Sequence, residues 1–475
     1  MIELYSTDLK LLNHTGSRKL EDLSQKRFAG VSTDSRTTKR GEIFFALRGD
    51  KFDGHRFVND AFSRGAAVAV VDALSDMADT AEGPVVLVHD TTRALGELAR
   101  HYREKFEIPV IAIGGSNGKT TTKDMIAQIL GTSYRVASTA GNFNNHIGVP
   151  LTLFQLTKKH EIAVVEIGTN HPGEIEALCD ILRPTHGLVT TIGKEHLEFF
   201  GSIEGVAAEE GTLYKYLRGK KKGTAFVYSD DEHVVAQSKG AQKIVRYGFS
   251  APRVHVKGKI LSIDQRGCAR FQFARTGEKK SSTVILQVPG EHHALNALAA
   301  ASVGLTFDVP SSRIRQALMK FRPASKRMEV MTCAGVLIYN DTYNANPDSM
   351  IAALRTLACT RVRGKKIAVL AEMRELGEHS YEEHARVGKQ VVELGIDYLL
   401  TYGESARVIY EEAGIRDRFH YDQKNVLAEY LLELLSPGDA VLVKGSRSMK
   451  MEDVVTFVQE RLRSTVRRLR RTGTG

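Results

Sequence analysis

Residues 114–121, which read GGSNGKTT, combine glycines, a lysine and threonines in an order suited to binding a nucleotide phosphate. In such a loop the backbone N–H groups surround the phosphate, the Lys119 amino group neutralises its charge, and the Thr120 hydroxyl contacts Mg²⁺. The usual pattern G-x-x-x-x-G-K-[ST] requires a glycine at position 113, where this chain has Ile113. The loop is therefore one residue short, and a glycine-rich turn with a solvated lysine is the alternative interpretation.

A carboxylate and an imidazole follow two later apolar runs and could complete a site for a metal-bound nucleotide. Glu166 ends the run IAVVE, the position at which an acid assists Mg²⁺ binding in phosphate-transferring enzymes. His196 comes shortly after the run HGLVTTI. Taken singly, a strand-end glutamate is often solvated and a lone histidine is often structural. As groups at the ends of strands of one sheet they are candidate Mg²⁺ ligands, although histidine is an unusual ligand for this ion.

The placing of these groups depends on a strand and a helix that flank the loop. Residues 109–113 form a short apolar run, and residues 119–130 carry apolar side chains at helical spacing, among them Met125, Ile126 and Ile129. A loop between a strand and a helix start directs backbone N–H groups and the positive end of the helix dipole at a bound anion. This context favours a nucleotide site over a chance run of glycines.

The pattern of apolar runs divides the chain into three blocks, at residues 1–104, 105–325 and 326–475. The middle block alternates strand-like and helix-like segments, which predicts a parallel sheet covered by helices, with ligands at the carboxyl ends of the strands. The third block repeats this α/β pattern on a smaller scale. Strands are expected near residues 42–47, 66–71 and 84–89 in the first block, 108–113, 162–167 and 186–192 in the second, and 365–372, 397–403 and 439–446 in the third.

Length and composition are those of a soluble protein with several domains. A chain of 475 residues predicts two to four domains, and 42% apolar with 26% charged residues is ordinary for a globular protein. No apolar run approaches the roughly 18 residues of a membrane helix, and the N-terminus lacks the layout of a signal peptide. We therefore expect a cytoplasmic protein. The cysteines lack the spacing of a zinc site or a disulfide framework: Cys179, Cys268, Cys333 and Cys359.

The net charge of +10 is concentrated at one end of the chain. Six arginines lie between Arg461 and Arg471 without an acidic residue, and the rest of the chain is only mildly basic. A mildly basic surface suits an enzyme with anionic substrates, and no basic stripe interleaved with aromatic residues indicates nucleic-acid binding. We expect no nucleic-acid partner and a solvated tail, with a lipid or nucleic-acid contact there as the alternative.

Nearly the whole chain resembles the Mur ligase family. The shortened loop GGSNGKTTT is the variant found in this family, which accounts for the missing glycine. The motif DTYNANPDSM, residues 341–350, resembles the branch that adds a D-alanyl-D-alanine dipeptide. The other matching motifs are TDSRTTKRGEIFFALRGDKFDGHRF, TAGNFNNHIGVPLTL, EIGTNHPGEI, GEHHALNALAA, KRMEV, EMRELGEHS and LVKGSRSMKMEDVV.

The resemblance implies a three-domain fold and an ATP-dependent ligation. A central P-loop domain with a parallel sheet, residues 105–325, would lie between an N-terminal α/β domain that binds a UDP-linked substrate and a C-terminal Rossmann-like domain. The implied cofactors are ATP and Mg²⁺. The implied reaction joins D-Ala-D-Ala to UDP-N-acetylmuramoyl-tripeptide through an acyl phosphate, in a monomeric enzyme of peptidoglycan precursor synthesis. A ligase adding a single amino acid, a nucleic-acid-stimulated ATPase and a non-catalytic nucleotide-binding module are the alternatives.

The resemblance also implies roles for individual residues. The catalytic set is Lys119, Glu166, His196, Glu210 and Arg327, and the Mg²⁺ ligands are Thr120, Glu166 and His196. The nucleotide-binding set is Gly115, Ser116, Asn117, Gly118, Lys119, Thr120, Thr121, Asn296 near adenine, Asp341 near ribose, and Arg327 at the γ-phosphate. The substrate-binding set is Ser35 and Arg36 at the uridine diphosphate, Asn145, and then Asn344, Asn346 and Ser349 for the dipeptide.

The chain departs from the family pattern at Glu210. Many members have a lysine there that CO₂ converts to a carbamate, whose charge helps to position a second Mg²⁺. A glutamate offers a carboxylate directly. We therefore expect Glu210 to replace the modified lysine and to make the enzyme independent of CO₂. In the alternative interpretation Glu210 lies on an exposed helix surface, as does its neighbour Glu209.

Overall fold

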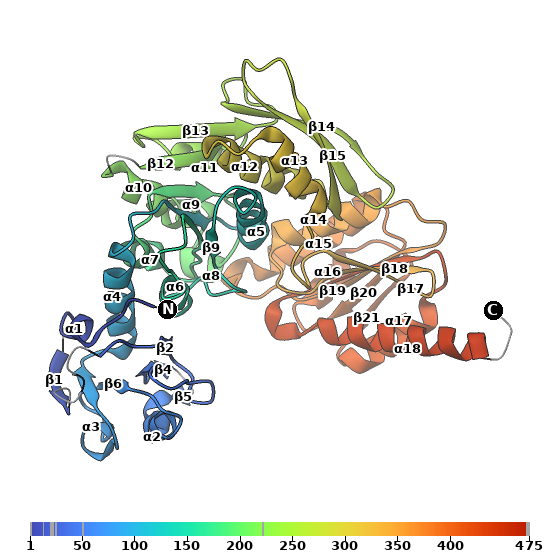
Figure 1. The fold of residues 1–475 in the computed structure, drawn as a ribbon. Coiled ribbons are helices and arrows are strands. Elements are labelled where there is room, and N and C mark those ends of the chain that lie inside the picture. The colour runs from blue at the N-terminus through green and yellow to red at the C-terminus, as the bar shows by residue number, and fades with distance from the viewer. Residues whose placement is uncertain are drawn as a thin grey trace.

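The computed structural model describes residues 2–12, 14–19, 23, 26–49, 52–220 and 223–471. Three sheets form three units that follow one another along the chain, and the central unit joins the other two (Figure 1). The α/β class predicted from the sequence and the three-unit architecture are confirmed. Each sheet draws its strands from one of the three predicted blocks, and the block boundaries stay a prediction.

The N-terminal unit is a five-stranded sheet with the order β1-β7-β6-β3-β2, in which only β1 is antiparallel to its neighbour. The strands are β1 His14–Arg18, β2 Val31–Ser32, β3 Ile43–Phe45, β6 Val68–Asp72 and β7 Val85–Val88, with a hairpin of β4 Arg48–Gly49 and β5 Phe52–Asp53. The helices are α1 Ser6–Leu9, η2 Gly54–Phe57, α2 Val58–Ser63, α3 Met77–Thr80 and α4 Thr91–Glu104. Helix α4 leads into the central unit, where the Tyr102 hydroxyl donates to the carbonyl of Leu156 at 2.7 Å.

The central unit is a nine-stranded sheet with the order β16-β15-β14-β13-β12-β11-β8-β10-β9. Strands β8 to β13 are parallel. Strands β8, β10, β11 and β12 are largely buried apolar runs because helices cover both faces, whereas β9 and β13 are more exposed. The chain adds β9 and β10 on one side of β8 and then β11 and β12 on the other. The strands are β8 Val110–Gly114, β9 Val136–Ser138, β10 Ile162–Glu166, β11 His186–Val189, β12 Thr224–Tyr228 and β13 Lys243–Gly248.

This reversal beside β8 creates the switch point at which α/β sheets bind ligands, beyond the carboxyl ends of the strands. Helix α5 begins at Lys119 directly after the glycine-rich loop, as the sequence predicts. Helices on this sheet are α5 Lys119–Leu130, α6 Gly148–Leu153, α7 Glu174–Leu182, α8 Leu197–Phe200, α9 Ile203–Glu210, α10 Thr212–Arg218, α11 Glu232–Gln237, α12 His292–Thr306 and α13 Ser311–Lys320.

Three further strands extend this sheet beyond the predicted parallel part. Strand β14 (Val256–Ile263) is parallel to β13, whereas β15 (Cys268–Arg275) and β16 (Ser282–Pro289) are antiparallel. Their side chains alternate between buried and exposed, because the sheet edge has one solvated face. The central sheet is therefore mixed at this edge and parallel where it carries the site.

The C-terminal unit is a six-stranded sheet with the order β17-β18-β22-β19-β20-β21, parallel except for the β17–β18 pair. The strands are β17 Glu329–Cys333, β18 Val336–Asp341, β19 Lys366–Ala371, β20 Tyr398–Tyr402, β21 Arg418–Tyr421 and β22 Ala440–Lys444. The helices are α14 Pro347–Cys359, η3 Gly377–His379, α15 Ser380–Glu393, α16 Ala406–Glu412, α17 Lys424–Leu434, η4 Arg447–Met449 and α18 Glu452–Arg471.

The predicted arginine-rich tail belongs in part to helix α18, which continues to Arg471; residues 472–475 lie outside the described residues. Within the residues that the structure describes, no helix is long and apolar enough to cross a membrane.

Candidate active site

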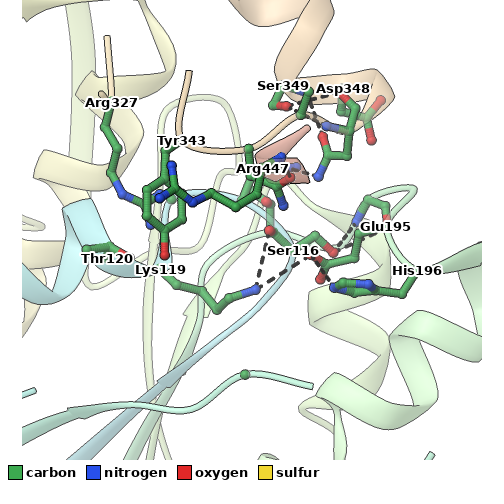
Figure 2. A pocket seen from close by; sticks show the side chains of 18 of the residues that line it. Ser116, Lys119, Thr120, Glu195, His196, Arg327, Tyr343, Asp348, Ser349 and Arg447 are labelled. Atoms are coloured by element: carbon green, nitrogen blue, oxygen red, sulfur yellow. Dashed lines mark hydrogen bonds and ion pairs between the residues drawn. The ribbon is translucent and has the colours of Figure 1, made fainter. Parts of the chain in front are cut away.

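The candidate site is a cavity of about 1030 Å³ between the central and C-terminal units. Segments that follow β8, β10 and β11 line it from the central unit, and segments that follow β18, β19 and β22 line it from the C-terminal unit. Two parallel sheets thus present their carboxyl ends to one cavity. Figure 2 shows Lys119 and Ser116 from the central unit facing Tyr343 and Arg447 from the C-terminal unit.

Two positions of the glycine-rich loop have a backbone conformation and close neighbours that allow only glycine. Gly118 has φ of +83°, and a Cβ there would lie 2.5 Å from Oδ1 of Asn296 on α12. Gly115 has φ of +109°, and a Cβ there would lie 2.6 Å from the backbone nitrogen of Thr190. The loop is fastened to the strand-end segment beside it, because Ser116 donates from its backbone nitrogen to the Thr191 carbonyl at 2.7 Å. The N-terminus of α5 is thereby fixed at the cavity, where its N–H groups favour an anion.

Lys119 lies largely buried at this helix start. Its amino group donates to the carbonyls of Gly115 and Ser116 and lies 3.6 Å from Oε2 of Glu195. Burial alone would lower the pKa of Lys119, but the carboxylates of Glu195, Glu210 and Glu166 outweigh burial and raise it. The residue is therefore a permanent cation at neutral pH, as binding of a phosphate requires.

Two acids in the cavity have carboxylate oxygens suited to a cation. Oε1 of Glu166 accepts from Nδ2 of Asn144 at 2.9 Å, whereas its Oε2 is buried without a hydrogen-bond partner among the described residues. Oε1 of Glu195 is likewise buried without a hydrogen-bond partner among the described residues. Because an unpaired buried carboxylate oxygen is costly, the donor set fits a hard divalent cation such as Mg²⁺. The described residues contain no cluster of three His, Cys, Asp or Glu placed to hold a metal, and Mg²⁺ commonly completes its shell with phosphate oxygens and water.

His196 lies between the two units. Its Nε2 is 3.9 Å from Oε2 of Glu195, and its Nδ1 is 2.5 Å from Oε2 of Glu375 in the C-terminal unit. The contact with the His196 ring lowers the pKa of Glu375 although burial opposes the shift, so the carboxylate stays ionised at neutral pH. Sequence analysis did not identify Glu375, although it lies in the motif EMRELGEHS.

Glu210 is fully buried at the end of α9, behind the glycine-rich loop. Its Oε2 accepts from the backbone nitrogen of Gly115 at 2.6 Å. Burial raises the pKa of Glu210 to about 7, although Lys119 opposes the shift. The interpretation of Glu209 and Glu210 as exposed surface residues is wrong, since both are buried and Glu209 accepts hydrogen bonds from the backbone of Gly173 and Ile175. Glu210 contacts the loop from behind and is not part of the cavity lining.

Cations from the C-terminal unit complete the cavity. The Arg327 guanidinium carbon lies 3.7 Å from the ring centroid of Tyr343, and that of Arg447 lies 5.8 Å from the same ring. The ring contact orients the Arg327 guanidinium without neutralising it, whereas Arg447 also forms an ion pair with Oε1 of Glu452 at 2.8 Å. Both carboxylate oxygens of Asp341, the residue predicted to bind ribose, already accept hydrogen bonds from the protein. Oδ2 accepts from the Lys444 amino group at 2.6 Å, and Oδ1 accepts from the backbone nitrogen of Met328 at 2.9 Å.

Asn145 and the residues predicted to bind the dipeptide line the cavity, and their side chains also form hydrogen bonds with backbone groups. Asn346 and Ser349 form a reciprocal cap at the start of α14, and Oδ1 of Asn145 accepts from the start of α6. Oδ1 of Asn344 accepts from the backbone of Arg447 at 3.3 Å.

The cavity brings together most of the predicted site residues. They are Ser116, Asn117, Gly118, Lys119, Thr120, Thr121, Asn145, Glu166, His196, Asn296, Arg327, Asp341, Asn344, Asn346 and Ser349. Gly115 belongs to the loop but does not line the cavity, and Glu210 lies behind the loop. Ser35 and Arg36 lie in the N-terminal unit, outside the cavity. Cavity residues that the sequence analysis did not single out include Asn144, Glu195, Tyr343, Asp348, Glu375, Lys444 and Arg447.

The phosphate-binding loop at the switch point, with a second parallel sheet that brings cations to the same cavity, defines an ATP-binding α/β enzyme. Family profiles match most of the chain: the Mur ligase middle domain matches residues 113–304, the Mur ligase glutamate ligase domain matches 326–447, and the Mur ligase catalytic domain matches 27–103. The chain belongs to the Mur ligase family.

Individual relatives can be aligned with this chain over most of their length. UDP-N-acetylmuramoyl-tripeptide–D-alanyl-D-alanine ligase from Bacillus subtilis is 37% identical, with 90% of this chain and 92% of that protein covered. The protein of the same name from Escherichia coli is 34% identical, with 90% and 93% covered. A crystal structure of MurF from Acinetobacter baumannii has a TM-score of 0.88 at 31% identity, covering 97% of this chain and 99% of that one. MurF from Thermotoga maritima in complex with ADP has a TM-score of 0.80 at 27% identity, covering 92% and 98%.

Proposed function

We propose that this chain is the ATP-dependent ligase that joins D-Ala-D-Ala to UDP-N-acetylmuramoyl-tripeptide, giving the UDP-linked pentapeptide, ADP and phosphate. The observation that carries the proposal is the meeting of Lys119, Arg327 and the unpaired oxygen of Glu166 in one cavity. The relatives that bear this activity in their names cover nearly the whole chain, and one related structure holds ADP.

The chemistry explains why the cavity needs so much positive charge. A carboxylate does not accept an amine at neutral pH, so an oxygen of the tripeptide carboxylate first attacks the γ-phosphorus of ATP and ADP leaves. This step brings two anions together, and Lys119 and Arg327 offset their repulsion. The neutral amine of D-Ala-D-Ala then attacks the acyl carbon, phosphate leaves and the amine loses a proton. Enclosure between two units keeps water from the acyl phosphate.

Mg²⁺ fits the acidic side of the cavity and would be held by Thr120, Glu166 and His196. When bound, it screens the charge of the phosphates and of the attacking carboxylate. Glu210 would act on the loop rather than on the ion, because it holds the backbone of Gly115. Glu210 would thus take the place of the CO₂-modified lysine without a direct contact to the ion, because its carboxylate orients the loop that carries Lys119 and Thr120.

The remaining roles concern the substrates and the nucleoside part of ATP. We assign adenine to Asn296, which lies against the glycine-rich loop, and ribose to Asp341, whose charge Lys444 balances. Ser35 and Arg36 would bind the uridine diphosphate, and the dipeptide would lie beside Asn344, Asn346 and Ser349. The proposed domains are residues 1–104, 105–325 and 326–475, in a monomeric cytoplasmic enzyme.

Phosphate release from ATP tests the proposal. Purified protein would receive UDP-N-acetylmuramoyl-tripeptide and D-Ala-D-Ala separately and together, with D-alanine alone as the comparison for a single-amino-acid ligase. We expect phosphate release only with both substrates and a pentapeptide product by mass. Release that is indifferent to both substrates would reject the ligase, and release stimulated by RNA or DNA instead would indicate the nucleic-acid-dependent class.

A further inference from the structure

The contact between His196 and Glu375 links the two units at the edge of the cavity. His196 follows β11 in the central unit and Glu375 follows β19 in the C-terminal unit, and Nδ1 of the ring is 2.5 Å from Oε2 of the carboxylate. The His196 side chain is 14% exposed and that of Glu375 is 47% exposed, so the pair joins a largely buried imidazole to an exposed carboxylate at the rim of the site.

The backbone on both sides of this contact is held in place. The Glu375 carbonyl accepts from the backbone nitrogen of Glu198 at 3.2 Å, and Nε2 of His379 lies 3.1 Å from the Gly201 carbonyl. A Cβ on Gly377 would lie 3.1 Å from Cα of Glu198, so the two backbones are close together. The segments therefore cannot slide past each other without losing these contacts.

Both partners adopt a backbone conformation that side chains other than glycine disfavour. His196 has φ of +49° and Glu375 has φ of +64°. Left-handed conformations of this kind carry strain and are concentrated at functional sites. Here the strained conformations place the imidazole and the carboxylate against each other across the boundary between the units.

The two nitrogens of the His196 ring face different groups. Nδ1 forms a close ion-pair contact with Glu375 that lies outside hydrogen-bond geometry in the described structure. Nε2 lies on the side of Glu195, whose Oε2 is 3.6 Å from the amino group of Lys119. A histidine that binds a metal through one nitrogen usually donates its other N–H to a carboxylate, which fixes the tautomer and the ring orientation. The observed arrangement leaves Nε2 as the nitrogen directed toward the phosphate-binding loop.

We propose that Glu375 is a positioning residue that orients the His196 ring, so that the C-terminal unit completes a cation site whose ligands belong to the central unit. This inference rests on the proposed role of His196 as a Mg²⁺ ligand. It goes further in making cation binding depend on contact between the units. Nucleotide binding by the central unit alone would then be insufficient to build the site.

Binding of Mn²⁺, followed by electron paramagnetic resonance in the presence of ADP, tests the inference without turnover. We expect Glu375→Ala to weaken Mn²⁺ binding by about 10- to 100-fold, the range found when the carboxylate partner of a metal-binding histidine is removed. Glu375→Gln retains an acceptor oxygen and should restore part of the affinity. Glu378→Ala, at an exposed position of the same segment, is the matched control.

A parallel measurement on His196→Ala separates the two proposals. Weaker Mn²⁺ binding in both His196→Ala and Glu375→Ala supports the positioning role. Weaker binding in His196→Ala alone, with Glu375→Ala equal to the Glu378→Ala control, overturns the positioning role and leaves the ligand role intact. Unchanged binding in His196→Ala overturns the ligand role, and the inference about Glu375 with it.

Discussion

Asn346 of the C-terminal unit donates a hydrogen bond from Nδ2 to Oδ1 of Asn117 in the phosphate-binding loop, at 3.0 Å. The same asparagine caps helix α14, so the start of that helix is fixed directly against the loop. Close by, the Asp348 carboxylate accepts from the backbone nitrogen of Lys194, and the Lys194 amino group contacts the buried carboxylate of Glu383. The two units are therefore joined by polar contacts at the site itself.

Lys119 should be indispensable for catalysis. Removal of its charge leaves the phosphates without the cation at the helix start, and loss of one such electrostatic contact costs about 10²- to 10³-fold in rate. We expect Lys119→Ala to lower kcat by at least that factor, measured as pentapeptide formation. Lys159→Ala, at an exposed position, is the control. A Lys119→Ala enzyme with more than a tenth of the wild-type rate would contradict this role.

Gly118 should matter for its lack of a side chain as well as for its backbone conformation. Gly118 and Gly173 have φ of +83° and +89°, but a Cβ at Gly118 meets Asn296 at 2.5 Å, whereas one at Gly173 meets no described atom within 4 Å. Each alanine substitution should cost about 1–2 kcal/mol of stability from backbone strain. Only Gly118→Ala should also weaken ADP binding, by more than tenfold in calorimetry. Equal ADP affinities in the two variants would refute the proposed loop geometry.

Glu210 should make stability depend on pH. Its pKa is raised to about 7 in the folded protein from a usual value of 4.5, so the folded state binds the proton more tightly than the unfolded state. The stabilisation is present below pH 4.5 and is lost as the pH rises through 7. Glu210→Gln removes the buried charge and should raise stability at pH 8 by roughly 1–3 kcal/mol, with little effect at pH 4.5. Thermal unfolding at several pH values measures this, and parallel profiles for the two proteins would contradict it.

Two fully buried tyrosines should respond differently to loss of the hydroxyl. The Tyr214 hydroxyl donates to the Phe226 carbonyl at 2.6 Å and accepts from the backbone nitrogen of Val189 at 3.1 Å. The Tyr247 hydroxyl has no partner within the part of the chain that the structure describes. Tyr214→Phe should therefore cost about 1–3 kcal/mol in denaturant unfolding, and Tyr247→Phe should be neutral or stabilising. The reverse order would show that these hydroxyl contacts are misassigned.

Local signals in the sequence are sufficient to predict the phosphate-binding loop, strand β8 before it and helix α5 after it. Helix α5 begins at Lys119 because the glycines end the strand and the apolar spacing starts there, and both features are visible along the chain. The antiparallel strand β15 also has a local signal, the alternation of apolar and polar residues in CARFQFAR, which is not a continuous buried apolar run. Strands at a solvated edge have period-two patterning instead of continuous apolar runs.

Contacts between units have no comparable signal. Glu375, the partner of His196, lies in the motif EMRELGEHS. Nothing in the spacing of that motif relates Glu375 to a residue far earlier in the chain. Likewise the burial of Glu210 against Gly115 depends on the packing of α9 behind the loop. The resemblance implies a substrate-binding role for Asn346 and Ser349, whereas their use as a helix cap is set by the local backbone.

The central claim is that the tripeptide carboxylate attacks the γ-phosphorus of ATP before the amine reacts. The most direct measurement uses UDP-N-acetylmuramoyl-tripeptide with ¹⁸O in the reacting carboxylate, followed by mass analysis of the released phosphate. Passage through an acyl phosphate transfers one carboxylate oxygen to phosphate, so each phosphate should carry one ¹⁸O. Pentapeptide formation with unlabelled phosphate would contradict the account, because it would require a bond to form without activation of that carboxylate.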